Sequence, residues 1–139
     1  MSVNFADAAQ RHWTDAEQLV TTQRWPNSDH FYGLAAECAL KEVMRALGMA
    51  LDSDDKPSDR KHRVHIDKLW SEFRTFASGR GASNYAAMLP ASNPFSDWGI
   101  EQRYWHSAQI LQGTVQPHRQ GALHARAVLS QARQDGRVK

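Results

Sequence analysis

The sequence has a single cysteine, Cys38, among 139 residues, so it cannot form an internal disulfide, and a cytoplasmic location is expected. No uninterrupted apolar run approaches the roughly 20 residues of a membrane span. Residues 1–10 lack a basic segment followed by an apolar run, so no targeting segment is expected. These absences predict a soluble protein without a membrane partner.

Several enzyme signatures are also missing. The sequence has no glycine-rich phosphate loop, no Gly-x-Ser-x-Gly motif and no paired Cys-x-x-Cys. No glutamate is followed three residues later by histidine, as carboxylate-bridged di-iron bundles require. Histidine is frequent instead, and a metal-bound helical enzyme is one hypothesis for His62, His65, His118 and His124. Solvated or hydrogen-bonding histidines explain the same pattern, and we predict neither a metal nor another cofactor.

Apolar residues recur at three- and four-residue steps along most of the chain, which is the period of a helical face. This pattern predicts helices over about 5–23, 28–47, 66–78, 85–89 and 115–134. Pro26 is expected to end the first helix and Gly48 the second. No segment alternates apolar and polar residues for long enough to indicate a sheet. We therefore expect one all-α domain over residues 1–139, a four- to five-helix antiparallel up-and-down bundle with a disordered tail over 135–139.

Two aromatic residues and one charged pair give further expectations about packing. Phe95 and Trp98 lie in a turn-rich segment and are large enough to pin it onto the bundle. Glu37 and Lys41 are four residues apart on the second predicted helix, an order worth about 0.2–0.5 kcal/mol when exposed. If this pair is enclosed, its charges need further partners. Cys38 lies between them in an apolar helix and is expected to be a buried packing residue.

The net charge of +2 conceals two parts of opposite sign. Residues 1–58 carry nine acids and five bases, whereas residues 59–139 carry six acids and twelve bases. A basic stripe recurs at seven-residue steps on the last predicted helix, within about 20° per heptad of one line. It consists of Arg119, Arg126 and Arg133, extended by Arg137 and Lys139. Such a stripe suits a phosphate backbone, although a solvated outer helix face shows the same pattern.

A second candidate for nucleotide contact is the run Arg103, Tyr104, Trp105 and His106. It combines a cation, a phenol, a stacking surface and an imidazole, which together could hold a nucleotide by stacking and phosphate pairing. The competing interpretation is that Tyr104 and Trp105 fasten the irregular segment to the core. The sequence favours this second interpretation, since large aromatic residues are usually buried.

A small-residue stretch precedes a Glu-x-x-Leu-Lys motif on the second predicted helix, within Tyr32-Gly33-Leu34-Ala35-Ala36-Glu37-Cys38-Ala39-Leu40-Lys41. The first predicted helix carries Arg11-His12-Trp13 and Asp15-Ala16-Glu17. Together these motifs resemble the opening of HEPN-domain proteins, which are small helical bundles of prokaryotes. The similarity continues more loosely through 65–70 and 97–104 and touches most of residues 5–134.

This resemblance implies a bundle that often dimerises and that, in many members, cleaves RNA without a metal. Active members carry Arg, and four to six residues later His, near the start of the last long helix, where Arg119 and His124 match. His124 would act as general acid or base, and Arg119 would stabilise charge on the phosphate. However, five residues along an ideal helix is a rotation of about 140°, so the two side chains diverge unless Gly121 loosens the turn.

Two hypotheses about function follow. The first is a HEPN-type homodimer of a toxin–antitoxin or defence system, which the resemblance would pair with a nucleotidyltransferase. It would act as a metal-independent endoribonuclease, or bind RNA or a nucleotide through Arg103, Tyr104, His106, Arg126 and Arg133. The second is a non-catalytic helical bundle that acts through protein contacts. The Arg–His spacing also occurs at Arg24–His30 and Arg60–His65, so this spacing does not distinguish the two hypotheses.

Overall fold

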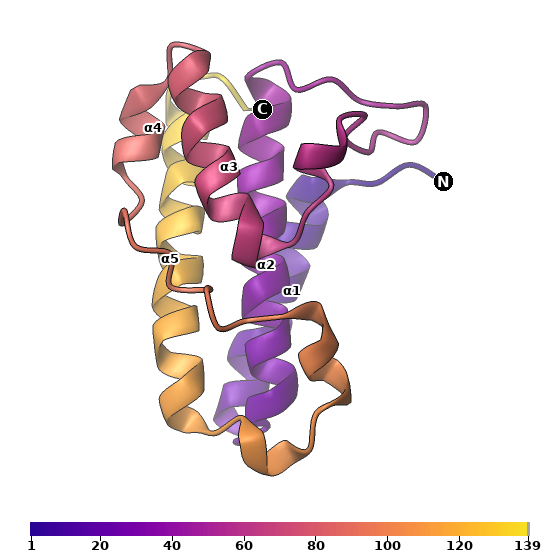
Figure 1. Ribbon diagram of the computed structural model, residues 1–139, viewed down its shortest axis with the longest axis vertical. Helices are drawn as coiled ribbons and strands as arrows, with labels where there is room; N and C mark the ends of the chain where they lie inside the picture. Colours follow the sequence, from indigo (N-terminus) through magenta and orange to yellow (C-terminus); the bar gives the residue numbers. More distant parts are fainter. Residues whose placement is uncertain (139) are drawn as a thin grey trace.

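The computed structural model describes residues 1–138 and is helical throughout its regular elements, which confirms the predicted all-α bundle (Figure 1). The five α-helices in this range are α1 (Phe5–Thr21), α2 (Trp25–Ala46), α3 (Ile66–Gly79), α4 (Ser83–Ala87) and α5 (Gln112–Gln134). Short 3-10 helices lie in the connections: η1 (Arg60–His62), η2 (Ile100–Tyr104) and η3 (Ser107–Gln109). None of the helices described is both long and apolar enough to cross a membrane.

The helix ends follow from ordinary capping. The Asn4 side chain accepts a hydrogen bond from the amide of Asp7 at 2.9 Å and so begins α1. α2 starts before the position predicted from the sequence, because Pro26 lies in its first turn, where the missing N–H costs no helical hydrogen bond. Gly48 follows α2 with a φ of +94°, the left-handed conformation in which many helices end.

α2 is the central helix, and α1, α3 and α5 pack around it (Figure 1). Asp29 near the start of α2 contacts His118 near the start of α5, so these two helices run in the same direction. Glu17 at the end of α1 contacts Arg119 near the start of α5, so α1 runs the opposite way. The helices therefore do not alternate strictly up and down. Long connections after α2 and after α4 carry the chain back along the bundle before α3 and α5 begin.

One continuous apolar core surrounds α2. Its largest fully buried side chains come from four helices and the connection before α5, and they include Tyr32, Leu40, Met44, Trp70, Phe73, Tyr85 and Phe95. Cys38 is buried at the edge of this core, as predicted. Burial raises the pKa of its thiol to about 12, so the side chain packs as a neutral apolar group.

The segment over residues 90–104, which is irregular up to the start of η2, crosses in front of α5 and α2 and is called the strap below (Figure 1). Phe95 and Trp98 of the strap are buried, which confirms that they pin it onto the bundle. A Cβ atom at Gly33 of α2 would collide with the Trp98 ring, and one at Gly121 of α5 would collide with Phe95. Gly121 thus leaves room for the strap to pack closely against α5. The helix is continuous at this residue, so Gly121 does not loosen a turn.

Residues 135–138 fall within the stretch predicted to be a disordered tail. The chain turns back at Gly136, whose φ is +77°, and Val138 is then only 4% exposed. The Tyr85 hydroxyl also donates a hydrogen bond to the Asp135 carboxylate at 2.5 Å. Apolar burial after a glycine turn therefore holds this segment against the end of the bundle. Lys139 lies outside the described residues.

Candidate nucleic-acid interface

A partly buried ionic network fastens the strap to α2 and α5. Nδ1 of His118 lies 2.6 Å from an Asp29 carboxylate oxygen, and Nε2 lies 2.7 Å from Asp97 of the strap. The other Asp29 oxygen accepts a hydrogen bond from Nε2 of Gln102 at 2.6 Å. Burial disfavours a charged imidazole, but the hydrogen bonds to Asp29 and Asp97 outweigh it and raise the pKa of His118. A doubly protonated ring can donate to both carboxylates at once.

Directly after this anchor the chain presents Arg103, Tyr104, Trp105 and His106 to solvent, a set called the aromatic surface below. Tyr104 is 77% exposed and Trp105 is 45% exposed. The interpretation that these two residues fasten the segment to the core is therefore wrong. Gln102 before them and Ile110 after them are buried and do so instead. Because Gln102 turns inward to Asp29, the residues that follow it face outward.

The aromatic surface places a cation and a hydrogen-bond donor beside exposed rings. The guanidinium carbon of Arg103 lies 4.9 Å from the centroid of the Tyr104 ring, within the range of a cation–π contact. Nδ1 of His106 accepts a hydrogen bond from the amide of Ala108 at 3.0 Å. Because Nδ1 is the acceptor of this bond, Nε2 is the ring nitrogen that can donate to a ligand. Aromatic faces next to cations suit an unpaired base and its phosphate.

The predicted arginine stripe lies along the border between α5 and α1. Arg119 is paired with Glu17 at 2.7 and 3.2 Å, and its hydrogen bonds hold the pKa of Glu17 below the usual value. Arg126 lies over the Trp13 ring, 4.6 Å from its centroid, and Arg133 is exposed. The stripe therefore exists, but α1 neutralises one of its three charges.

Arg119 and His124 are not brought together within one chain. α5 is continuous through both residues, so their side chains diverge by about 140° around the helix axis. Arg119 faces Glu17 on α1, whereas His124 is exposed. A catalytic site that uses both residues would need groups from a second chain.

The histidines of the metal hypothesis lie apart from one another. His62 is buried against Phe76, with ring centroids 5.2 Å apart, and His118 lies in the strap network. His65 bonds to Glu37, and His124 is exposed on α5. Across residues 1–138, no three His, Cys, Asp or Glu side chains are grouped so that they could hold a metal ion.

The Glu37–Lys41 pair is enclosed, at 3.1 Å, and it has the further partners that enclosure requires. Nδ1 of His65 lies 3.0 Å from the second Glu37 oxygen, and Nζ of Lys41 lies 5.9 Å from the centroid of the Phe5 ring. The hydrogen bond to Glu37 raises the pKa of His65 above its usual value. This network ties the start of α3 to the middle of α2.

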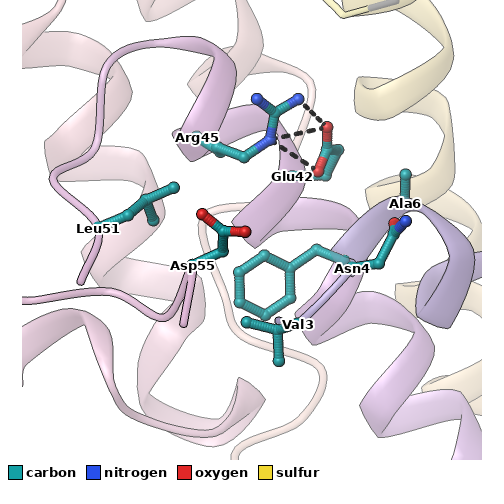
Figure 2. A pocket seen from close by; sticks show the side chains of 8 residues that line it. Val3, Asn4, Ala6, Glu42, Arg45, Leu51 and Asp55 are labelled. Atoms are coloured by element: carbon teal, nitrogen blue, oxygen red, sulfur yellow. Dashed lines mark hydrogen bonds and ion pairs between the residues drawn. The ribbon is translucent and has the colours of Figure 1, made fainter. Parts of the chain in front are cut away.

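A pocket of about 390 Å³ lies between the N-terminal segment and the loop after α2 (Figure 2). Arg45 and Glu42 pair with each other on one wall, and the carboxylate of Asp55 points into the open space (Figure 2). Two carboxylates face a single guanidinium in this lining, so the pocket repels phosphate. It does not extend the interface formed by the aromatic surface.

Sequence reasoning missed the residues that position the aromatic surface. Asp29, Gln102 and Asp97 meet His118 only in the folded chain, and Asp29 lies 89 residues before it. No periodicity marks contacts at such separations. The available signal was that Asp29 and His118 are polar residues on otherwise apolar helix faces.

No protein-family model, curated protein or solved structure matches the chain.

Proposed function

We propose that this protein is a HEPN-like helical bundle that binds single-stranded RNA through the aromatic surface and acts without cleaving it. The observation that carries the proposal is the exposure of Tyr104 and Trp105 on a segment that is fastened on both sides. Stacking of a base on an aromatic ring is worth about 1–3 kcal/mol. Single strands are favoured over duplexes because only unpaired bases offer their faces to such rings.

Charge on the same surface supports an RNA ligand. The Arg103 guanidinium lies over the Tyr104 ring, and Nε2 of His106 can donate because Nδ1 accepts from Ala108. Both groups can pair with phosphates next to a stacked base. Anchoring of the segment on both sides also favours RNA affinity, because a preformed surface loses little conformational entropy on binding. Arg126 and Arg133 supply further positive charge on α5.

The ribonuclease version of the HEPN-like proposal depends on dimerisation. Arg119 is held by Glu17 and His124 points elsewhere, so cleavage would require two copies that reorganise these side chains. A homodimer, a nucleotidyltransferase partner and a toxin–antitoxin or defence role belong to the proposal through the resemblance alone. If the protein is a nuclease, His124→Ala should abolish RNA cleavage by the purified protein. We expect no cleavage from either form.

A second candidate, a protein-interaction module, is favoured by one observation. Leu111 is 58% exposed close in sequence to Trp105, and an aliphatic side chain adds nothing to base stacking. A protein partner would use Trp105 and Leu111 together as apolar anchors. The two functions therefore differ in their dependence on Leu111.

Binding of a labelled, unstructured RNA dodecamer, followed by fluorescence anisotropy, tests the proposal. Tyr104→Ala and Trp105→Ala should each weaken binding about tenfold, since loss of a stacked base costs roughly 1–3 kcal/mol. Leu111→Ala is the matched control and should bind RNA like the unmodified chain. Unchanged RNA binding in both aromatic variants would contradict the proposal.

A further inference from the structure

A small pocket of about 160 Å³ lies between α1 and α5, away from the strap network. Ala6, Ala9 and Gln10 line it from α1, and Arg126, Leu129, Ser130 and Arg133 line it from α5. Its apolar lining residues are two alanines and a leucine, and its polar side chains are all neutral or positively charged. This composition differs from that of the pocket in Figure 2, which carries two carboxylates.

The register of α1 against α5 leaves two charges of the arginine stripe without a counter-charge. The two helices run antiparallel, so Glu17 faces Arg119, and Gln10, one heptad earlier, faces Arg126. Both Nη atoms of Arg126 lie 3.4 Å from the Gln10 carboxamide oxygen, which is neutral. Within residues 1–138, neither Arg126 nor Arg133 forms an ion pair.

Arg126 is held in an environment that favours an added anion. Its guanidinium is half-buried against Trp13, at 4.6 Å from the ring centroid. Burial and the nearby positive charge of Arg133 lower the pKa of Arg126. Seven residues separate the two arginines, about 10.5 Å along the helix, so their long side chains can converge on one small ion between them. Ser130 lies on the same helix face and offers a hydroxyl donor.

We propose that the pocket between α1 and α5 binds a phosphate group, held by the guanidinium groups of Arg126 and Arg133 and by the Ser130 hydroxyl. A tetrahedral anion fits a pocket of this volume and can accept hydrogen bonds from the arginine and serine side chains that line it. The phosphate belongs either to an RNA strand or to a small phosphorylated molecule. The inference goes beyond base stacking and stands without it, because it uses no residue of the aromatic surface.

The test titrates the full chain with inorganic phosphate while the Nε–Hε NMR signals of its arginines are followed. The signals of Arg126 and Arg133 should shift and saturate, whereas that of Arg11, which is exposed and paired with Asp7, should not. Arg133→Gln should weaken phosphate binding about tenfold, the loss of one charge-assisted hydrogen bond. Arg133 is exposed, so this variant should fold normally.

Gln10→Glu is the sharper variant, because it repeats the Glu17–Arg119 arrangement one heptad earlier. The new carboxylate should pair with Arg126 and abolish phosphate binding while the fold stays intact. Tyr104→Ala should leave phosphate binding unchanged, which separates this site from the stacking proposal. Phosphate shifts that do not saturate, or that persist at full strength in Gln10→Glu and Arg133→Gln, would overturn the inference.

Two RNA strands of one sequence, with a 5′-phosphate or a 5′-hydroxyl, distinguish the sources of the phosphate. A preference for the phosphorylated strand, lost in Gln10→Glu, identifies a terminal phosphate. Equal binding of both strands, weakened in Gln10→Glu, identifies backbone phosphates. Binding of inorganic phosphate but of neither strand at this pocket identifies a small phosphorylated ligand. Once inorganic phosphate has saturated the arginine signals, each of these results supports a phosphate site, and failure with all three probes contradicts it.

Discussion

At the scale of single residues, His118 is the link on which the position of the strap depends. Its two ring nitrogens bond to Asp29 on α2 and Asp97 on the strap, so the imidazole joins three parts of the chain. The contact with Asp29 is fully enclosed, whereas Asp97 is exposed and its attraction is screened by water. Most of the stabilisation therefore comes from the buried Asp29–His118 pair.

His118 should make stability depend on pH in a defined direction. The pKa of His118 in the folded protein is raised above the unfolded value of about 6.5. The contribution of the protonated imidazole to the free energy of unfolding is therefore complete below about pH 6.5. The contribution is lost as pH rises through the folded pKa. His118→Asn should cost about 3–5 kcal/mol near pH 5.5, because the variant leaves Asp29 buried without its counter-charge. The cost should shrink toward pH 9, as measured by urea unfolding.

The milder substitution Asp97→Asn serves as the control for this prediction. It removes only the exposed partner, so the protein should fold and show a weaker form of the same pH dependence. A difference in unfolding free energy between the unmodified protein and His118→Asn that grows as pH rises would show that His118 is neutral in the fold.

At the scale of elements, the helices were predictable and the strap was only partly so. α1, α3 and α4 lie close to the ranges predicted from apolar periodicity, because the apolar face of a helix repeats every three or four residues in the sequence. The burial of Phe95 and Trp98 followed from their size. The exposure of Tyr104 and Trp105 did not follow, because it is decided by the inward turn of Gln102 to Asp29, 73 residues away in sequence.

The close approach of the strap to α2 predicts opposite effects of two glycine substitutions. Gly33→Ala puts a methyl group where the Trp98 ring lies and should destabilise the protein by about 1–3 kcal/mol. Gly113→Ala on α5 meets no atom within 4 Å and should stabilise it by about 0.4–1 kcal/mol. Urea unfolding of both variants measures the contrast. Equal stability of the two would mean that the strap does not rest on Gly33.

At the scale of the whole molecule, the two parts of opposite charge build different surfaces. The acidic first part supplies Glu42 and Asp55 to the pocket in Figure 2, which repels phosphate. The basic second part supplies Arg103 to the aromatic surface, and Arg126 and Arg133 to the border with α1. α1 neutralises this border only at Glu17. The near-neutral total charge therefore hides two basic surfaces, the aromatic surface and the border between α1 and α5, and each favours an anionic ligand.

This division predicts how RNA binding should respond to salt. For single strands the slope of log affinity against log salt is about −0.7 for each phosphate neutralised. Arg103→Gln should therefore make the slope shallower by about 0.7, whereas Tyr104→Ala should lower affinity with little change of slope. Arg11→Gln is the control, since Asp7 already pairs with Arg11. Equal slopes in the unmodified protein and Arg103→Gln would place the phosphates elsewhere.

The most direct test of the proposed function is to map where RNA touches the protein. Ultraviolet crosslinking of an unstructured uridine-rich strand to the unmodified chain, followed by trypsin digestion and mass spectrometry, identifies the peptides in contact. We predict crosslinks in the peptide Tyr104–Arg119, which begins with both exposed aromatic residues, and specifically at Tyr104 or Trp105. Crosslinks confined to other peptides, or a complete absence of crosslinks under saturating RNA, would contradict it.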